Sequence, residues 1–522
     1  MKVQLENLDE LGLVLDRPPS EIDPRAFSSG LNIRFLDGRI VSTLPDSEIL
    51  AGATDTPLFL IPWINDTVLY WLYATPTKIW RVLSTHSDIS GGAYHATADL
   101  RWVGTIFSGI PILTNASLVD KPQRLNLTTG LMQDLDNFPV TDYVKVVRQY
   151  GNFLIGLNLK RGADLFPHTI KWSDAAPLGT LPGSWDAADP TTFAGERDLG
   201  SDYGVIVDCL ELGRMNIVYK EDAAFAMTLV GGQSVFSTNP LPFKRGLIAP
   251  NCVCQVPMGH FVLGQGRVYI HNGNTFEDII EGKALKWFFN NIHDTYIART
   301  WVIQHPILPE VWIGYVSNDS TNGYHDRVGI WNWKNGTWAV RDIDSITFAA
   351  QGYVSGTDAA INDYTQVINS YTQIFNARTY NLARKIMVGC SPVSTMPLQK
   401  LDEVTTIATA KAFFIERLDL PLLGQAQDGT LEVDTSTTKF LRRIYFKLKG
   451  AGTVTIKFGQ RSSVEASIDW GPAYLFEIGV DRYIDCWLQY TLLSYRIEST
   501  GMADFEYLGA SMEIEPLGEN TL

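Results

Sequence analysis

One pattern recurs along most of this 522-residue chain: a short turn is followed at once by an apolar run. The clearest copy is Gly151-Asn152 leading into Phe153-Leu154-Ile155. A tight turn that feeds a β-rich run is typical of the middle of a hairpin. The turn residues that mark the six copies are Asn65, Gly109, Gly151, Gly213, Gly259 and Glu310.

The spacing of these hairpins predicts the fold. Four of the five intervals between markers are 42–51 residues, and a four-stranded β-propeller blade takes about 40–50 residues. The sixth unit is the most regular, with Asn335-Gly336 between two alternating strands. Lys385-Ile386-Met387-Val388 and Pro397 to Leu401 indicate a weaker seventh unit. We therefore predict an all-β protein whose residues 51–404 form a propeller of six or seven blades.

One interval is longer because Ser173 to Tyr203 is rich in Asp, Pro, Gly and Thr. Such a stretch predicts a loop inserted into one blade, and long loops are commonly functional or interfacial. Its acidic side chains form either a solvated face or a surface that repels DNA. The candidate lumen or interface residues of this loop are Asp174, Trp185, Asp186, Asp189, Glu196, Asp198 and Asp202.

The two ends of the chain differ from the repeats. Residues 1–50 predict an extended arm, because Arg17-Pro18-Pro19 disfavours helix and Asp37-Gly38 predicts a hairpin. A solvated tail is the alternative. Residues 405–522 carry short strands every 10–15 residues, which predicts a C-terminal β-sandwich. Only Thr275 to Asn291 or Thr365 to Arg384 could hold a helix.

Composition narrows the classes of function. The net charge is −15, which opposes tight binding of nucleic acid through a basic face. The N-terminus has no signal-peptide pattern, and we predict no membrane segment. The five cysteines, Cys209, Cys252, Cys254, Cys390 and Cys486, predict reduced and mostly buried thiols.

Motifs for catalysis are missing from the sequence. No nucleophile elbow, phosphate-binding loop or metal-ligand spacing occurs. His293 and His325 lie in turn-like contexts and are expected to be solvated. The numerous aromatic residues could line a sugar groove or, more simply, pack between twisted sheets. We therefore predict no catalytic residues, no metal, no cofactor and no enzyme activity.

The order of several weak motifs resembles the nozzle proteins of short-tailed bacteriophages. In many of these, an early proline precedes an aromatic-Ser pair, Asn-hydrophobic-Arg-Phe and a Gly turn. The motifs here are Leu15 to Gly38, Val146 to Ile155, Ile170 to Ser173, Pro182 to Asp186, Ile217 to Glu221, Ile330 to Trp333, Ile456 to Gln460 and Asp469 to Pro472.

This resemblance implies a structural virion protein assembled in the host cytoplasm. It implies a homohexameric tail tube below the portal and head-to-tail adaptor, which retains packaged DNA and conducts it without sequence recognition. Tail spikes or fibres and a distal plug are the further partners that it implies. The residues expected to contact the adaptor or a neighbouring subunit are Arg17, Pro18, Pro19, Phe27 and Arg34.

Two alternatives remain open from the sequence. One is a carbohydrate-binding or depolymerising tail propeller, and the other is a minor tail hub protein of a long-tailed phage. A glycan screen or the neighbouring genes would discriminate between them and the nozzle.

Overall fold

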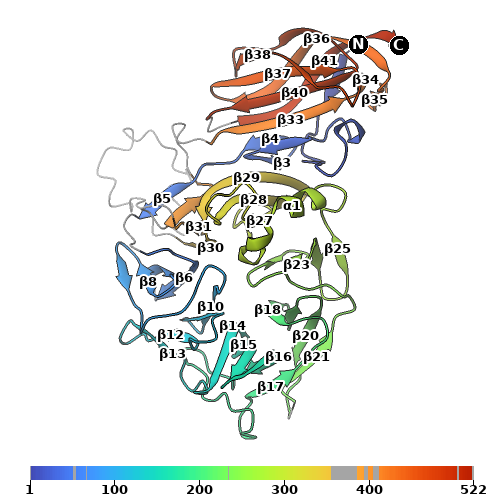
Figure 1. The fold of residues 1–522 in the computed structure, drawn as a ribbon. Coiled ribbons are helices and arrows are strands. Elements are labelled where there is room, and N and C mark those ends of the chain that lie inside the picture. Colours follow the sequence, from blue (N-terminus) through green and yellow to red (C-terminus); the bar gives the residue numbers. More distant parts are fainter. Residues whose placement is uncertain are drawn as a thin grey trace.

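A computed structural model describes residues 2–50, 55–65, 68–232, 234–353, 385–392, 398–403, 411–501 and 505–519. These residues form almost entirely antiparallel β-structure, so the predicted all-β class is confirmed. The strands group into seven four-stranded sheets and two larger sheets, with a small two-stranded ribbon. Figure 1 shows the seven small sheets around a common centre, with the larger sheets at one side.

The seven four-stranded sheets follow one another along the chain. The first four contain β6 (Phe59–Asn65), β7 (Val68–Ala74), β8 (Ile79–Val82) and β9 (His86–Asp88); β10 (Trp102–Phe107), β11 (Ile110–Asn115), β12 (Gln123–Leu125) and β13 (Met132–Asp134); β14 (Asp142–Tyr150), β15 (Phe153–Arg161), β16 (Asp164–Trp172) and β17 (Gly195–Asp198); β18 (Ile206–Leu212), β19 (Met215–Lys220), β20 (Ala224–Leu229) and β21 (Phe236–Pro240). The other three contain β22 (Val253–Val256), β23 (Gly259–Gly264), β24 (Arg267–His271) and β25 (Phe276–Asp278); β26 (Trp301–Gln304), β27 (Glu310–Tyr315), β28 (His325–Asn332) and β29 (Thr337–Ile346); β30 (Phe348–Tyr353), β31 (Lys385–Cys390), β32 (Leu398–Leu401) and β5 (Ser47–Leu50).

The first strands of these sheets close a ring. Each of β6, β10, β14, β18, β22 and β26 contacts the first strand of the next sheet, and β30 contacts β6. We call this arrangement the sheet ring. Its seventh sheet takes its fourth strand, β5, from the N-terminal 50 residues. The ring is therefore closed by pairing two segments that lie far apart in the chain.

The six predicted hairpins are confirmed, because each joins the first and second strands of one sheet in the ring. The turn at Gly151 has a positive φ of 54°, which glycine adopts without steric cost. Tyr150 and Phe153 directly flank this turn as a cross-strand pair. Local turn chemistry and an apolar run are therefore sufficient to specify this part of each sheet.

Buried tryptophans pack over glycines of the neighbouring strand in their own sheet. Trp301 pairs directly with Gly314, and a Cβ on Gly314 would lie 2.1 Å from the indole. Trp172 pairs with Gly195 in the same way, with a Cβ contact of 2.4 Å. Because glycine has no side chain, the indole lies flat on the neighbouring strand. Much of the aromatic content therefore serves packing.

The two larger sheets combine both ends of the chain. The six-stranded sheet contains β1 (Lys2–Leu5), β3 (Ile33–Leu36), β4 (Arg39–Ser42), β36 (Thr437–Gly450), β39 (Ile484–Tyr490) and β41 (Phe505–Glu519). The five-stranded sheet contains β2 (Ser29–Leu31), β33 (Phe413–Leu420), β37 (Thr453–Arg461), β38 (Asp469–Glu477) and β40 (Leu492–Ser499). The ribbon is β34 (Leu422–Gln425) with β35 (Leu431–Val433).

Aromatic rings from both larger sheets meet in one core, and we call these two sheets the paired sheets. Phe446 of β36 lies 6.3 Å from Phe458 of β37, measured between ring centroids. Phe413 of β33 lies 4.5 Å from Phe505 of β41. The predicted Asp37-Gly38 hairpin joins β3 and β4, with both φ values positive. Residues 2–50 therefore supply four strands of the paired sheets and one of the ring, an exchange that the sequence does not reveal.

Helix is confined to short connections in the described residues. Helix α1 (Leu285–Asn291) falls within the expected Thr275–Asn291 stretch, and two 3₁₀ turns occur at η1 (Pro19–Glu21) and η2 (Asp294–Arg299). The other expected helical stretch, Thr365 to Arg384, lies outside the described residues, as does most of the polar segment after Tyr353.

Candidate functional site

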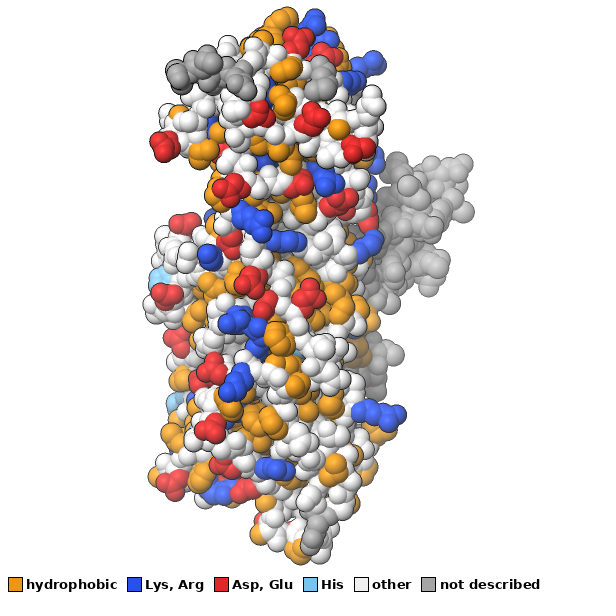
Figure 2. Space-filling model, turned by 90° about the vertical axis from the view of Figure 1, so that its right-hand side faces the viewer, with side chains coloured by type: hydrophobic (Ala, Val, Ile, Leu, Met, Phe, Trp, Pro, Cys, Tyr) orange, Lys and Arg blue, Asp and Glu red, His pale blue; other side chains and the backbone are white. Residues whose placement is uncertain are grey.

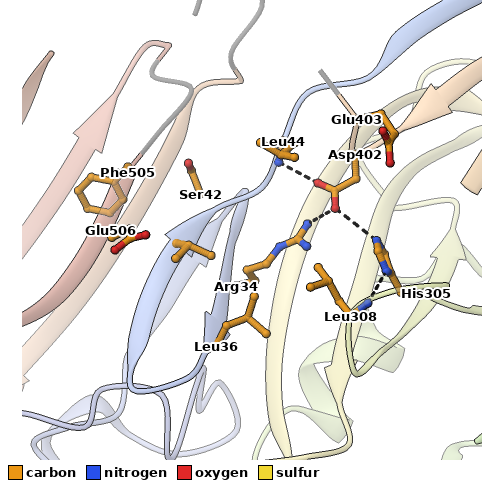
Figure 3. A pocket seen from close by; sticks show the side chains of 11 residues that line it. Arg34, Leu36, Ser42, Leu44, His305, Leu308, Asp402, Glu403, Phe505 and Glu506 are labelled. Atoms are coloured by element: carbon orange, nitrogen blue, oxygen red, sulfur yellow. Dashed lines mark hydrogen bonds and ion pairs between the residues drawn. The ribbon is translucent and has the colours of Figure 1, made fainter. Parts of the chain in front are cut away.

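The most concentrated group of buried charges lies where the sheet ring meets the paired sheets. Arg34 of β3 donates to Asp402 with a distance of 2.7 Å between Nη2 and Oδ2, and its Nη1 lies 3.6 Å from Glu310 Oε2. His305 Nδ1 accepts the Leu308 N–H, so its Nε2 is the protonated nitrogen that faces Asp402 at 3.5 Å. Arg34, His305 and Asp402 come from three parts of the chain and lie together in Figure 3, and Glu310 belongs to the same cluster.

A second ion-pair group continues this cluster. Arg341 of β29 is fully buried and donates to Asp46 at 2.6 Å and to the Leu44 carbonyl at 2.7 Å. Lys411 reaches Asp46 at 3.0 Å and Asp342 at 3.2 Å. The Asp402 N–H donates to Asp46 Oδ1 at 2.9 Å, which connects the two groups. We call the whole set the ionic junction.

Burial and charge oppose each other at the acids of the ionic junction. Desolvation alone would raise the pKa of Asp402, but the nearby Arg34 charge and the hydrogen bond from His305 outweigh it, and the pKa lies below its ordinary value. The pKa of Asp46 is lowered too, because Arg341 and Lys411 outweigh its burial. Both acids are therefore ionised at neutral pH and hold their cations in place.

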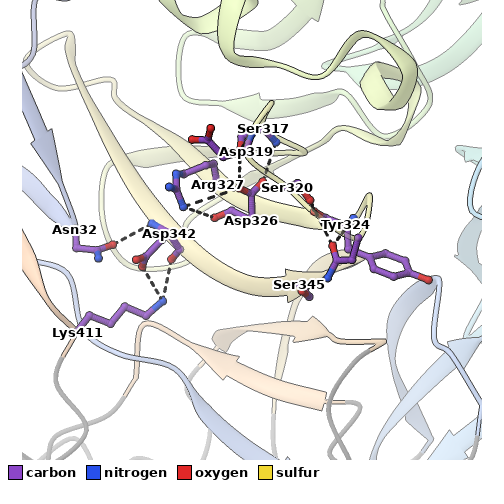
Figure 4. Close-up of polar contacts among 11 residues, drawn as sticks. Asn32, Ser317, Asp319, Ser320, Tyr324, Asp326, Arg327, Asp342, Ser345 and Lys411 are labelled. Carbon is purple, nitrogen blue, oxygen red and sulfur yellow. Dashed lines mark hydrogen bonds and ion pairs between the residues drawn. The ribbon is translucent and has the colours of Figure 1, made fainter.

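Asn32 explains why polar and apolar residues alternate in the run Asn32-Ile33-Arg34-Phe35 of the N-terminal arm. Its side-chain oxygen accepts the Asp342 N–H at 2.9 Å (Figure 4), and its Nδ2 donates to the Ala412 carbonyl at 2.7 Å. Ile33 and Phe35 lie in the apolar core, while Asn32 and Arg34 contact the ring. The Asn-Ile-Arg-Phe run is thus buried on both faces, between the ring and the paired sheets.

A cavity of about 230 Å³ lies beside the ionic junction. Its lining combines Arg34, His305 and Asp402 with Phe505 and Glu506 of β41 (Figure 3). The volume is below the roughly 300–1,000 Å³ of ordinary small-molecule sites. The charged groups point at one another. This arrangement therefore supports a structural role, in which ion pairs hold the paired sheets on the sheet ring.

The predicted acidic loop lies at the outer side of the ring, since β17 is the last strand of its sheet. Trp185 is buried and anchors the loop edge-to-face against Phe138, with 5.0 Å between ring centroids. Asp174 is partly buried and accepts the Phe193 N–H at 2.9 Å. These two predicted residues therefore hold the loop in its conformation.

The other predicted loop residues are more exposed and are not gathered at one point. Glu196 belongs to β17 and pairs with Arg161 at 2.6 Å, whereas Asp198 ends that strand. Asp186 and Asp189 accept backbone N–H groups two residues further along the chain, as turn-forming aspartates do. Asp202 lies in the connection to β18, where its carbonyl accepts from Lys220.

The predicted contact residues of the arm divide into two groups. Arg17 and Pro18 are exposed and Pro19 is half-buried, so these three can reach another molecule. Phe27 is buried against Tyr495 and Tyr507, and Arg34 lies in the ionic junction. Phe27 and Arg34 therefore stabilise their own chain in this structure.

A hydrogen-bond chain of two histidines and a tyrosine lies between the fourth and fifth sheets. Tyr219 Oη lies 2.7 Å from both His260 Nδ1 and His271 Nε2. The Gly273 N–H donates to His271 Nδ1, and His260 Nε2 faces the Glu211 carbonyl at 3.0 Å. Each imidazole is therefore neutral, with one donor and one acceptor nitrogen. Burial lowers the pKa of His260 to about 4 and that of His271 to about 3.

His325, which was expected to be solvated, is buried at the start of β28. Its two ring nitrogens face the carbonyls of Ile346 and Arg299 at 2.5 and 2.8 Å. Burial lowers the pKa of His325, and the charge of Arg101 acts in the same direction. The expectation was wrong because His325 begins a strand that is covered by its neighbours, which the surrounding turn residues do not indicate.

Neither a metal-binding cluster nor a membrane-spanning helix is present among the described residues. Among the described residues, no group of three or more His, Cys, Asp or Glu side chains is arranged to hold a metal ion. Within the same ranges, no helix has the length and apolar character needed to cross a membrane. All five cysteines are free thiols.

Comparison with known proteins gives little similarity. No model of a known protein family matches the chain, and no curated protein matches it. One similar solved structure is a functionally unknown protein from Desulfotomaculum acetoxidans DSM 771, with 11% identity and a TM-score of 0.33. The match covers 59% of this chain and 96% of that chain.

Proposed function

We propose that this protein is a structural subunit of the tail nozzle of a short-tailed bacteriophage. In this proposal the sheet ring is a seven-bladed β-propeller, and the paired sheets are a β-sandwich held on it by residues 1–50. Six copies form a tube below the portal and adaptor, through which packaged DNA leaves the particle. The subunit acts by assembly and carries out no reaction.

The observation that carries this proposal is an uncovered edge on the paired sheets. At one edge, β2 and β3 lie against β29 of the ring. At the other edge, β38 and β39 are the last strands of their sheets, and no described strand pairs with their outer sides. Leu475 is 75% exposed there, Val480 65% and Trp487 62%. An apolar free edge associates readily with another chain, so a neighbouring subunit is its expected cover.

The ionic junction supports the same proposal, because it fixes the uncovered edge relative to the ring. Six subunits can form one closed tube only if each presents its contact surfaces at a constant angle. Arg34 with Asp402, and Arg341 with Asp46, tie β3 and the following segment to the ring. Buried and hydrogen-bonded ion pairs suit this positioning role because they tolerate little displacement.

Surface charge fits passage of DNA without adhesion. The chain carries a net charge of −15, so a hexamer would carry about −90 before ion binding. The face in Figure 2 mixes acidic, basic and hydrophobic side chains, a composition that suits contact with protein. We therefore expect this face to lie against protein, and the DNA-facing wall to lie elsewhere.

The expected result for the purified protein is a six-fold ring in electron micrographs, either alone or after addition of its cognate adaptor ring. Trp487→Glu and Leu475→Glu should each abolish the six-fold ring of subunits, because each places a charge on the uncovered edge. Mass photometry would measure the assembly, and circular dichroism would check folding.

Val140→Glu is the matched control, since Val140 is 78% exposed on the sheet ring. This variant should assemble like the original protein. A protein that stays monomeric alone and with the adaptor would refute the proposal. Assembly that survives both edge substitutions would show that the subunit contact lies elsewhere.

A further inference from the structure

A large hollow lies on the outer side of the ring, between the third and fourth sheets. It has a volume of about 960 Å³ and is bounded by residues 187–194, by β17 and by Gly232, Ser234 and Val235 before β21. We call it the rim groove. Its volume falls within the range of about 300–1,000 Å³ that is usual for small-molecule sites.

Aromatic side chains form the apolar part of the rim groove. Trp172 and Phe236 lie edge-to-face at its base, with 5.4 Å between ring centroids. Phe193 lines the groove and is 52% exposed, although an isolated exposed phenylalanine gains nothing for the fold. An exposed ring beside a buried aromatic base offers flat apolar surface to a ligand.

Hydrogen bonds fix this surface in advance of any ligand. The Phe193 N–H donates to Asp174 Oδ1 and its carbonyl accepts from Trp172 Nε1, both at 2.9 Å. Asp189 Oδ1 accepts from the backbone N–H and the hydroxyl of Thr191 at 2.9 and 2.6 Å. Because the loop is already ordered, binding would require little loss of conformational entropy.

Arg197 is the cation of the rim groove, whose lining also holds the carboxylates of Asp189 and Glu196. The exposed arginine lines the groove and has no ion pair among the described residues. Its neighbour Glu196 is instead engaged with Arg161 at 2.6 Å and Lys171 at 3.4 Å. Arg197 is paired in register with Ile170 and Gly195 with Trp172, which places the guanidinium on the strand face that carries the aromatic base.

We propose that the rim groove binds an acidic oligosaccharide, such as an oligouronate. The guanidinium of Arg197 can donate two parallel hydrogen bonds to a uronate carboxylate. Phe193 offers its ring to the C–H face of a pyranose, and the hydroxyls of Thr191, Thr192 and Ser234 can exchange hydrogen bonds with those of the sugar. Glu196 is held by its two cations and Asp189 by the N–H and hydroxyl of Thr191, so we expect the site to bind the sugar without cleaving it.

Isothermal titration of the full chain with hexagalacturonate tests this inference, and maltohexaose is the neutral probe of equal length. We expect saturable binding of the uronate at submillimolar concentration, and binding of the neutral sugar that is weaker by at least about tenfold. Raising the salt concentration should weaken uronate binding, because the contact is exposed and ionic. No new reducing ends should appear on incubation.

Arg197→Gln and Phe193→Ala should each weaken uronate binding by about tenfold or more. Arg482→Gln removes an exposed arginine from the paired sheets and should leave binding unchanged. No binding at millimolar uronate, or binding that Arg197→Gln leaves unchanged, would overturn the proposal. Equal binding of both sugars would overturn its acidic specificity. These titrations do not depend on ring assembly, so their outcome is separate from that of the nozzle proposal.

Discussion

Replacement of Asp402 by asparagine is expected to lower the free energy of unfolding by about 3–5 kcal/mol. The carboxylate is buried and accepts from Arg34 and from the Leu44 N–H at 2.7 and 2.8 Å. Asparagine has nearly the same shape and tolerates the positive φ of 62° at this position, so the change removes the charge and turns one of two accepting oxygens into an NH2 group that faces donors. Denaturant titration followed by tryptophan fluorescence would measure the loss.

The exposed pair of Lys334 with Asp37 is the matched control for Asp402→Asn. These side chains are 69% and 64% exposed at a distance of 2.9 Å, and Asp37→Asn should leave the unfolding midpoint unchanged. The double variant Arg34→Met with Asp402→Asn should be less destabilised than the two single losses added together, because neither member of the pair is left buried without the other, while Glu310 loses its cation in Arg34→Met and the double variant alike. Additive losses would show that Arg34 and Asp402 act independently.

Acid should destabilise the fold well above the pH at which its carboxylates titrate. His260, His271 and His325 have folded-state pKa values of about 4, about 3 and about 3, below the ordinary value of 6.5. The unfolded chain therefore binds about three more protons than the folded chain between pH 6.5 and about 4. Stability is complete above pH 6.5 and falls with decreasing pH by up to about 1.4 kcal/mol per unit for each histidine, which gives about 6 kcal/mol at pH 5.

Unfolding measured from pH 7.5 to pH 4.5 would test this expectation. His271→Gln removes one of the three titrating groups and should lower the slope by about a third, whatever its effect on stability at neutral pH. Arg482→Gln is the control, because it replaces an exposed side chain whose type does not titrate in this pH range, and it should leave the slope unchanged. A slope that is the same in His271→Gln and the original protein would show that other groups take up the protons.

Local patterns predicted the parts of the fold that depend on neighbouring residues. The six hairpins and the Asp37-Gly38 turn depend on turn residues beside apolar runs, and both are present in the structure. Pairing between distant strands left no comparable signal, as with Lys2 opposite Glu513. The sequence predicts β5 to be part of the N-terminal arm, although this strand completes the seventh sheet of the ring.

In the candidate site too, local patterns were visible in the sequence and contacts between distant residues were not. Arg34 belongs to a motif visible in the sequence, but its partner Asp402 lies 368 positions away and nothing around it marks a buried acid. His260 and His271 lie on neighbouring strands, and only the register of β23 with β24 reveals that they face each other. The loop after Trp172 was identified from composition alone, whereas the rim groove beside it depends on residues of the next sheet.

The exchange of strands between the two ends of the chain has a consequence for biosynthesis. A ribosome releases β1, β2 and the β3–β4 hairpin first, yet β41, the partner of β1 and β4, and β33, the partner of β2, emerge last. The nascent chain must therefore keep β1, β2 and the outer side of β4 unpaired while the whole ring is being translated, a period of tens of seconds at about 5–20 residues per second. Such long-range pairing also folds slowly. A chaperone that shields the first 50 residues during translation would therefore increase the yield of native protein more than one that acts on the finished chain.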